Sequence, residues 1–129
     1  MKIGIDIDGT ITEARQFFSF LTHVLLESGH EVHIISYRED TREQIRQELK
    51  VYNVRYTDIH LPQPNDAMDV WKGKLAEKLD LDIMFDDSPE VLDKMPLKVK
   101  RFWMCNPEVI NMQHVITGLR AGMRIGVID

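Results

Sequence analysis

The sequence predicts a three-layer α/β/α protein in which helices cover both faces of a mainly parallel sheet of about five strands. Apolar runs rich in β-branched residues alternate along the chain with segments of helical spacing. Polar residues follow several of these runs, at the strand ends where α/β folds place their sites. With 129 residues, the chain can bury one sizeable core but is too short for two ordinary domains, so we expect residues 1–129 to form a single domain.

The first strand is predicted within residues 2–8, where three isoleucines alternate with glycine and acids. A β-hairpin is the alternative, because Asp-Gly between apolar runs is a strong turn signal. The helical pattern that follows Glu13 favours a strand followed by a helix, and a hairpin gives no reason for an acid at position 6.

A helix is predicted over residues 14–28, with Gly29 as its stop. Its apolar side chains recur at helical spacing and predict one buried face: Phe17, Leu21, Val24 and Leu25. The apolar run 31–36 predicts a second strand, and charge pairs at helical spacing predict a second helix within residues 38–49.

The alternation continues in the second half of the chain. A proline-rich loop, residues 61–66, interrupts it, and residues 122–129 fit either an edge strand or a packed extension. The predicted elements are a strand near 54–59, a helix at about 68–79, a strand at 81–87, a short helix at 88–95 and a strand at 99–105. In the helix at 68–79 the predicted buried face consists of Met68, Trp71, Leu75 and Leu79.

Composition narrows the class of protein. The chain is 43% hydrophobic and 29% charged, as in folded globular proteins. No window approaches the roughly 18 apolar residues of a membrane span and no signal-peptide pattern opens the chain, so we expect a cytoplasmic protein without a membrane partner. A net charge of −5 argues against extended nucleic-acid binding. A local basic cluster leaves contact with a nucleic-acid end open: Lys98, Lys100 and Arg101.

Polar residues stand at the ends of three predicted strands. Ser36 follows the second strand, and a lysine at position 72 or 74 lies near the start of the helix that precedes the fourth. Acidic pairs follow the first and fourth strands: Asp6 with Asp8, and Asp86 with Asp87. The ends of parallel strands meet at one edge, so these groups should converge in one crevice.

The expected chemistry follows from these groups. Carboxylates this close repel, and they need a divalent cation or shared protons to coexist. A site with only oxygen ligands suits Mg²⁺. Together with a lysine, a hydroxyl and backbone amides at a glycine turn, it would suit a phosphoryl group. The remaining aspartates could then supply a nucleophile and a proton donor.

Four motifs resemble those of the haloacid dehalogenase (HAD) superfamily, in that family's order. They are "DIDGT" at 6–10, "HIIS" at 33–36, the lysine at 72 or 74, and "MFDDSPE" at 84–90. The resemblance implies a Rossmann-like core, dependence on Mg²⁺ and attack on phosphorus by the first aspartate.

By this resemblance Asp6 would be the nucleophile that forms an aspartyl-phosphate. Asp8 would protonate the leaving oxygen and then activate water. The metal would be held by Asp6, the backbone carbonyl of Asp8 and an acid of the last pair. We prefer Asp87 for direct coordination, with Asp86 either sharing the ion or binding its water.

The resemblance also implies a phosphate-binding set made of Ser36 and the amides near Gly9 and Thr10, with one lysine. Lys72 is preferred because it stands at the helix start, and Lys74 remains the alternative. Arg38, just beyond the serine, either contacts substrate or is simply exposed.

The acid at position 8 indicates a phosphatase or phosphotransferase, because dehalogenases of the family lack it and its transport ATPases carry threonine there. Only about 25 residues separate Thr10 from Ser36, and the span from Ser36 to Lys72 holds only a helix, a strand and a loop. No separate cap domain fits. The crevice should therefore be open, as in small nucleotidase-like members.

An open crevice leaves several substrates: a nucleotide, an oligonucleotide end, a sugar phosphate or a phosphoprotein. A neighbouring subunit could close over a small one, which would make the protein a homo-oligomer. Two other functions are weighed. A receiver-like signalling domain would accept phosphate on an aspartate after its third strand, near Asp58, and a catalytically idle HAD-like interaction protein would bind Mg²⁺ without turnover.

Overall fold

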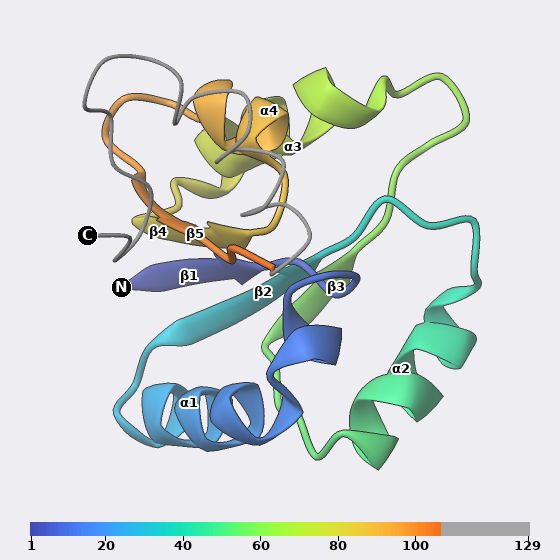
Figure 1. The fold of residues 1–129 in the computed structure, drawn as a ribbon, viewed down its shortest axis with the longest axis vertical. Coiled ribbons are helices and arrows are strands. Elements are labelled where there is room, and N and C mark those ends of the chain that lie inside the picture. The colour runs from blue at the N-terminus through green and yellow to red at the C-terminus, as the bar shows by residue number, and fades with distance from the viewer. Residues whose placement is uncertain (107–129) are drawn as a thin grey trace.

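The computed structural model describes residues 1–106 and contains one sheet of five parallel strands. The strand order is β3-β2-β1-β4-β5, so the first strand is central (Figure 1). The strands are β1 (Lys2–Ile5), β2 (Glu31–Ile35), β3 (Asp58–His60), β4 (Ile83–Asp86) and β5 (Lys100–Trp103).

Helices lie on both faces of the sheet, with α1 and α2 on one face and α3 and α4 on the other (Figure 1). The helical elements are η1 (Ile11–Glu13), α1 (Arg15–Glu27), α2 (Arg42–Val51), α3 (Met68–Leu79) and α4 (Pro89–Asp93). The predicted three-layer, Rossmann-like class is therefore confirmed, and the described residues contain no separate cap. The segment 122–129 lies outside the described residues. None of the described helices has the length and apolar character to cross a membrane.

Each face of the sheet has its own apolar core. Ile5, Phe18 and Ile45 join β1, α1 and α2 on one side. Ile35, Ala76 and Met84 join β2, α3 and β4 on the other. The two cores hold the sheet rigidly between the helix layers, which fixes the position of the strand ends.

Local signals set several helix ends. Thr41 and Gln44 form a capping box at the start of α2, each side chain bonding the backbone N–H of the other. Ser88 caps α4 and Pro89 occupies its first turn. Gly29, with φ of 84°, follows α1 in the left-handed conformation.

The first motif is a strand followed by a turn and helices, and not a hairpin. Residues 6–10 turn away from the sheet and lead through η1 into α1. The third strand is shorter than predicted, because Val54 donates its N–H to the carbonyl of Leu49 and so belongs to the end of α2. The strand itself begins at Asp58.

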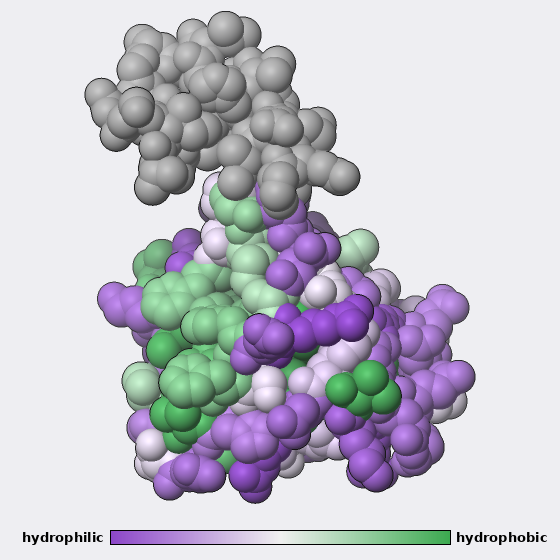
Figure 2. All heavy atoms as spheres, turned by 60° about the horizontal axis from the view of Figure 1, so that its bottom comes forward, coloured by the Kyte–Doolittle hydropathy of each residue, from purple (hydrophilic) through white to green (hydrophobic). Residues whose placement is uncertain are grey.

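The predicted buried face of α1 is partly right, because two of its four residues pack against the core. Phe18 and Thr22 are fully buried, whereas Phe17 is 48% and Val24 43% exposed. The ring of Phe18 meets the edge of the ring of Phe85, at 5.5 Å between centroids. On the surface seen in Figure 2, apolar side chains gather in one part, beside a more hydrophilic part.

Three of the four residues in the predicted buried face of α3 pack, partly buried, against the core, and Met68, the fourth, is 55% exposed. The most buried residues of the helix are Lys72, Gly73 and Ala76. A Cβ on Gly73 would lie 2.5 Å from the carbonyl oxygen of Lys94, so the helix approaches the end of α4 too closely for a side chain there.

Candidate functional site

Three carboxylates meet at the carboxyl ends of β1 and β4. Ile5 pairs with Phe85, so Asp6 follows β1 beside Asp86, the last residue of β4. One oxygen from each of Asp6, Asp86 and Asp87 lies within 4.8 Å of the others. The sheet order thus brings together acids that are 80 residues apart.

Lys72 lies among these acids. Its Nζ is 2.8 Å from Asp6 Oδ1 and 2.8 Å from Asp86 Oδ2, and the residue is 4% exposed. Burial alone would lower the pKa of Lys72, but the two carboxylates outweigh it and raise the pKa above its usual value. Lys74 is exposed on α3. Of the two lysines that the sequence left open, Lys72 is the one at the acids.

The cluster holds more negative than positive charge. Burial raises the pKa of Asp6 from 3.8 to about 7, against the attraction of Lys72 and with added repulsion from Asp86 and Asp87. Burial also raises the pKa of Asp87, and repulsion from Asp86 adds to it. One ammonium does not balance three carboxylates, so a divalent cation or a proton would relieve the repulsion.

The donor set fits a hard cation, because every group in it is a carboxylate oxygen. Asp86 is already held at both oxygens, by Lys72 and by the N–H of Ser88 at 2.9 Å. Asp87 is only partly buried. This difference favours Asp87 as the direct ligand.

The glycine of the first motif lies against this acid. Gly9 has φ of 77°, and a Cβ added to it would lie 2.1 Å from Asp87 Oδ2. A side chain at position 9 would therefore both strain the backbone and displace the carboxylate.

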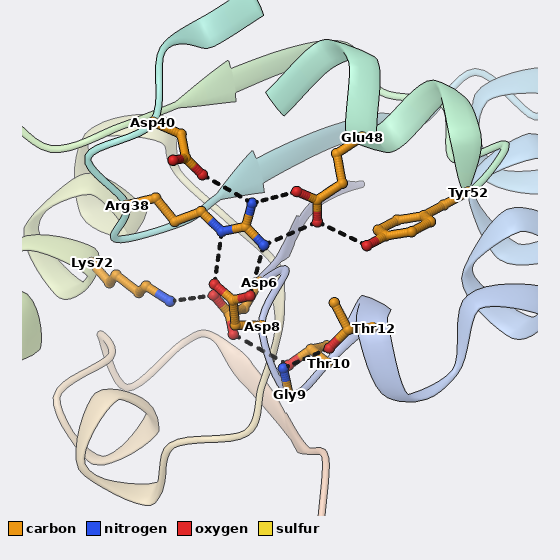
Figure 3. A network of polar contacts seen from close by, with 10 residues as sticks. All are labelled: Asp6, Asp8, Gly9, Thr10, Thr12, Arg38, Asp40, Glu48, Tyr52 and Lys72. Atoms are coloured by element: carbon orange, nitrogen blue, oxygen red, sulfur yellow. Dashed lines mark hydrogen bonds and ion pairs between the residues drawn. The ribbon is translucent and has the colours of Figure 1, made fainter. Parts of the chain in front are cut away.

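The two backbone N–H groups that were predicted to bind phosphate already donate hydrogen bonds within the turn. Gly9 donates its N–H to the hydroxyl of Thr12 at 2.9 Å, and Thr10 donates its N–H to the carbonyl of Ile7 at 3.2 Å. The buried hydroxyl of Thr10 donates to Asp6 Oδ2 at 3.4 Å (Figure 3). The side chain of Thr10 thus contacts the carboxylate of Asp6. The side chain of Thr12, which was not predicted to have a role, accepts a hydrogen bond within the turn.

Ser36 occupies the end of β2 as predicted. It is 1% exposed, and its hydroxyl has no hydrogen-bond partner among the residues that the structure describes. Its N–H donates to the carbonyl of His60. A buried hydroxyl without a partner costs roughly 1–3 kcal/mol, so this group calls for a ligand or another explanation.

Asp8 points to Arg38 and is not part of the three-carboxylate cluster. Arg38 donates from Nε to Asp8 Oδ2 at 2.8 Å and from Nη2 to Oδ1 at 2.6 Å. The hydrogen bonds from Arg38 outweigh the effect of burial and lower the pKa of Asp8. The carboxylate form of Asp8 is therefore favoured in this arrangement.

Arg38 is neither exposed nor free. Its side chain is 14% exposed, and Nη1 and Nη2 also donate to Glu48 at 2.6 and 3.0 Å. A fifth hydrogen bond joins Nη1 to Asp40 at 3.3 Å, and Tyr52 donates to Glu48 at 3.0 Å (Figure 3). All five guanidinium N–H donors are thus used. Glu48 was not predicted, and its spacing of four from Tyr52, the residue that caps the end of α2, was the available signal.

Comparisons with known proteins give the fold alone. No protein-family model matches the sequence, and no curated protein matches it. Among solved structures, an uncharacterized protein from Corynebacterium glutamicum ATCC 13032 Kitasato is similar, with a TM-score of 0.55 and 13% sequence identity. The match covers 95% of this chain and 98% of that chain.

Proposed function

We propose that the chain is a Mg²⁺-dependent phosphomonoesterase of the HAD type, acting through an aspartyl-phosphate at Asp6. The supporting observation is the contact of one buried lysine with two acids at neighbouring strand ends. Lys72 lies 2.8 Å from both Asp6 and Asp86, and Asp87 completes the carboxylate group. Lysine, carboxylates and the orphan Ser36 hydroxyl form a set that suits a metal-bound phosphoryl group.

The metal would be held by Asp6 and Asp87, with Asp86 close enough to share it or to bind its water. The backbone carbonyl of Asp8 is a further ligand by resemblance. A bound Mg²⁺ would offset the carboxylate charge and draw electron density from the phosphoryl oxygens. Lys72 and the hydroxyl of Ser36 would donate hydrogen bonds to those oxygens.

The proposed reaction has two steps. In the first, an oxygen of Asp6 forms a bond to phosphorus while the bond to the leaving oxygen breaks, and that oxygen takes a proton from Asp8. In the second, Asp8 takes a proton from water, whose oxygen attacks the same phosphorus and releases inorganic phosphate and Asp6. The contact with Arg38 favours the carboxylate form of Asp8, so Asp8 must first take up a proton from solvent, which it then gives to the leaving oxygen.

The receiver-like alternative lacks support in the topology. A receiver of the flavodoxin-like kind has the order 2-1-3-4-5, with its third strand beside the first. Here β3 is the edge strand next to β2, and Asp58 begins it in an ion pair with Arg42 at 3.1 Å. An aspartate there lies away from the three-carboxylate cluster.

The decisive experiment measures phosphate release from p-nitrophenyl phosphate, nucleoside monophosphates, sugar phosphates, a phosphopeptide and end-phosphorylated oligonucleotides. Wild type and Asp6→Asn are compared with Mg²⁺ and with EDTA, and exposed Asp93→Asn is the matched control. We expect Mg²⁺-dependent release that Asp6→Asn abolishes and Asp93→Asn retains. Undiminished activity of Asp6→Asn would refute the proposal, and Mg²⁺ binding without release from any substrate would favour the idle interaction protein.

A further inference from the structure

A hollow lies beyond the carboxyl ends of β2 and β3. Its volume is about 470 Å³, and it lies between the segment that follows β2 and the proline-rich loop that follows β3. Its lining includes Tyr37, Arg38, Glu39, Asp40, Leu61 and Pro62. Arg38 forms part of its wall and also contacts Asp8, so this one residue connects the hollow with the proposed proton donor.

One wall of the hollow is apolar and fixed. Tyr37 donates its hydroxyl to the carbonyl of Asp66 at 2.6 Å, and its ring meets the edge of Trp71 at 6.0 Å between centroids. Leu61 and Pro62 complete this wall. Such a surface suits the carbon skeleton of an alcohol.

The charged residues of the described chain that line the hollow offer carboxylate acceptors and no unused cationic donor. Among the described residues that line it, Arg38 is the single cationic one, and all five of its N–H donors already bond to carboxylates. Glu39 and the second carboxylate oxygen of Asp40 remain as acceptors, and both residues are exposed. An anion entering the hollow would meet carboxylates and find no unused guanidinium donor.

We propose that this hollow receives the leaving group, and that it selects a neutral or amine-bearing alcohol over one that bears a second negative charge. This inference rests on the proposed phosphomonoesterase function. During the first step the leaving oxygen must lie beside Asp8, so the rest of the alcohol extends toward the adjoining hollow. Hydroxyl or ammonium donors on it could then bond to Glu39 and Asp40.

The inference narrows the substrates left open by the sequence. Phosphorylated amino alcohols and polyols fit the hollow, as do nucleoside monophosphates whose only phosphate is the one removed. Nucleoside bisphosphates and oligonucleotide ends place further phosphates near Glu39 and Asp40, where like charges repel. We therefore expect nucleic-acid ends to be poor substrates.

Three substrates of nearly equal size test this selection: 2-aminoethyl phosphate, 2-hydroxyethyl phosphate and carboxymethyl phosphate. They carry a cation, a neutral hydroxyl and an anion at the same distance from phosphorus. We expect kcat/KM for the aminoethyl ester to exceed that for the carboxymethyl ester about tenfold or more, an order of magnitude typical of one close like charge. The ratio should shrink as salt is raised from 0.05 to 0.5 M.

Variants assign the selection to the hollow. Asp40→Asn and Glu39→Gln should each reduce the ratio of kcat/KM for the aminoethyl ester to kcat/KM for the carboxymethyl ester several-fold. The control is Glu27→Gln, at an exposed acid that ends α1 and does not line the hollow, and it should leave the ratio unchanged. A wild-type ratio near one, or a ratio that neither variant changes, would overturn the inference while leaving the phosphatase intact. Absence of release from all three esters and from p-nitrophenyl phosphate would overturn both.

Discussion

Lys72 is the residue on which the site depends most directly, because within residues 1–106 its ammonium is the one positive group that contacts the carboxylate cluster. Removing one partner of a buried ion pair leaves uncompensated charge and typically costs about 3–5 kcal/mol. We expect Lys72→Met to lower the free energy of unfolding by that order at pH 7, as measured by urea denaturation. Exposed Lys74→Met, two residues away, is the matched control and should change it little. Equal losses in the free energy of unfolding of the two variants would contradict the role of Lys72 in neutralising the carboxylates.

The raised pKa of Asp6 predicts a pH dependence of stability. The folded state holds this proton until about pH 7, whereas the unfolded chain releases it near 3.8. Between these values the unfolded state binds fewer protons, so this group makes stability fall as pH rises, by up to about 1.4 kcal/mol per pH unit. The measurement is urea unfolding of metal-free protein from pH 4 to 7. Asp6→Asn should remove this part of the decline, and identical profiles for the two proteins would count against it.

Not every contact of single residues could be read from the sequence. The positions of Asp6 and Ser36 followed from strand ends, because a parallel sheet brings such ends together. For the lysine the sequence left Lys72 and Lys74 open, and the structure places Lys72 at the acids. The contact of Asp8 with Arg38 could not be predicted in the same way. It joins two loops 30 residues apart and depends on the path of the chain after β2.

At the scale of elements, the sequence predicted where helices occur better than which face they bury. The bounds of α3 agree with the prediction, and three of the four residues in its predicted apolar face pack against the core, but its most buried residues are others, Lys72 among them. Apolar spacing includes neither the two carboxylates that contact Lys72 nor the close approach at Gly73. A buried lysine is therefore missed when the buried face is predicted from apolar residues alone.

The turn after β1 provides a test at the same scale. Gly9 and Gly29 both have positive φ, of 77° and 84°, but a Cβ at Gly29 would meet nothing within 4 Å. Each change to alanine should destabilise the fold by about 1–2 kcal/mol through the backbone conformation. Only Gly9→Ala should also weaken Mg²⁺ binding, because its Cβ would displace Asp87. Isothermal titration with Mg²⁺ beside urea unfolding checks both effects, and equal Mg²⁺ affinity in the two variants would refute the role given to Gly9.

At the scale of the whole molecule, the strand order determines which groups meet. The alternation of strands and helices predicted a parallel sheet, but it did not specify that β1 lies between β2 and β4. That order depends on the crossover connections, which pack differently on each face. It brings Asp6 beside Asp86 at the point where the order of strands reverses, between β1 and β4, and leaves Ser36 one strand away, after β2.

The carboxylate cluster predicts that a cation stabilises the entire fold. A ligand that binds only the folded state adds RT ln(1 + [L]/Kd), which is about 2.7 kcal/mol at a hundredfold excess over Kd. We expect the thermal midpoint to rise with Mg²⁺ concentration, followed by calorimetry at fixed ionic strength so that screening stays constant. Asp87→Asn should abolish the rise, and Asp80→Asn, an exposed acid at the end of α3, should retain it. A midpoint that rises equally in both variants would mean that Mg²⁺ acts elsewhere on the acidic surface, and the three aspartates would then lack their proposed role.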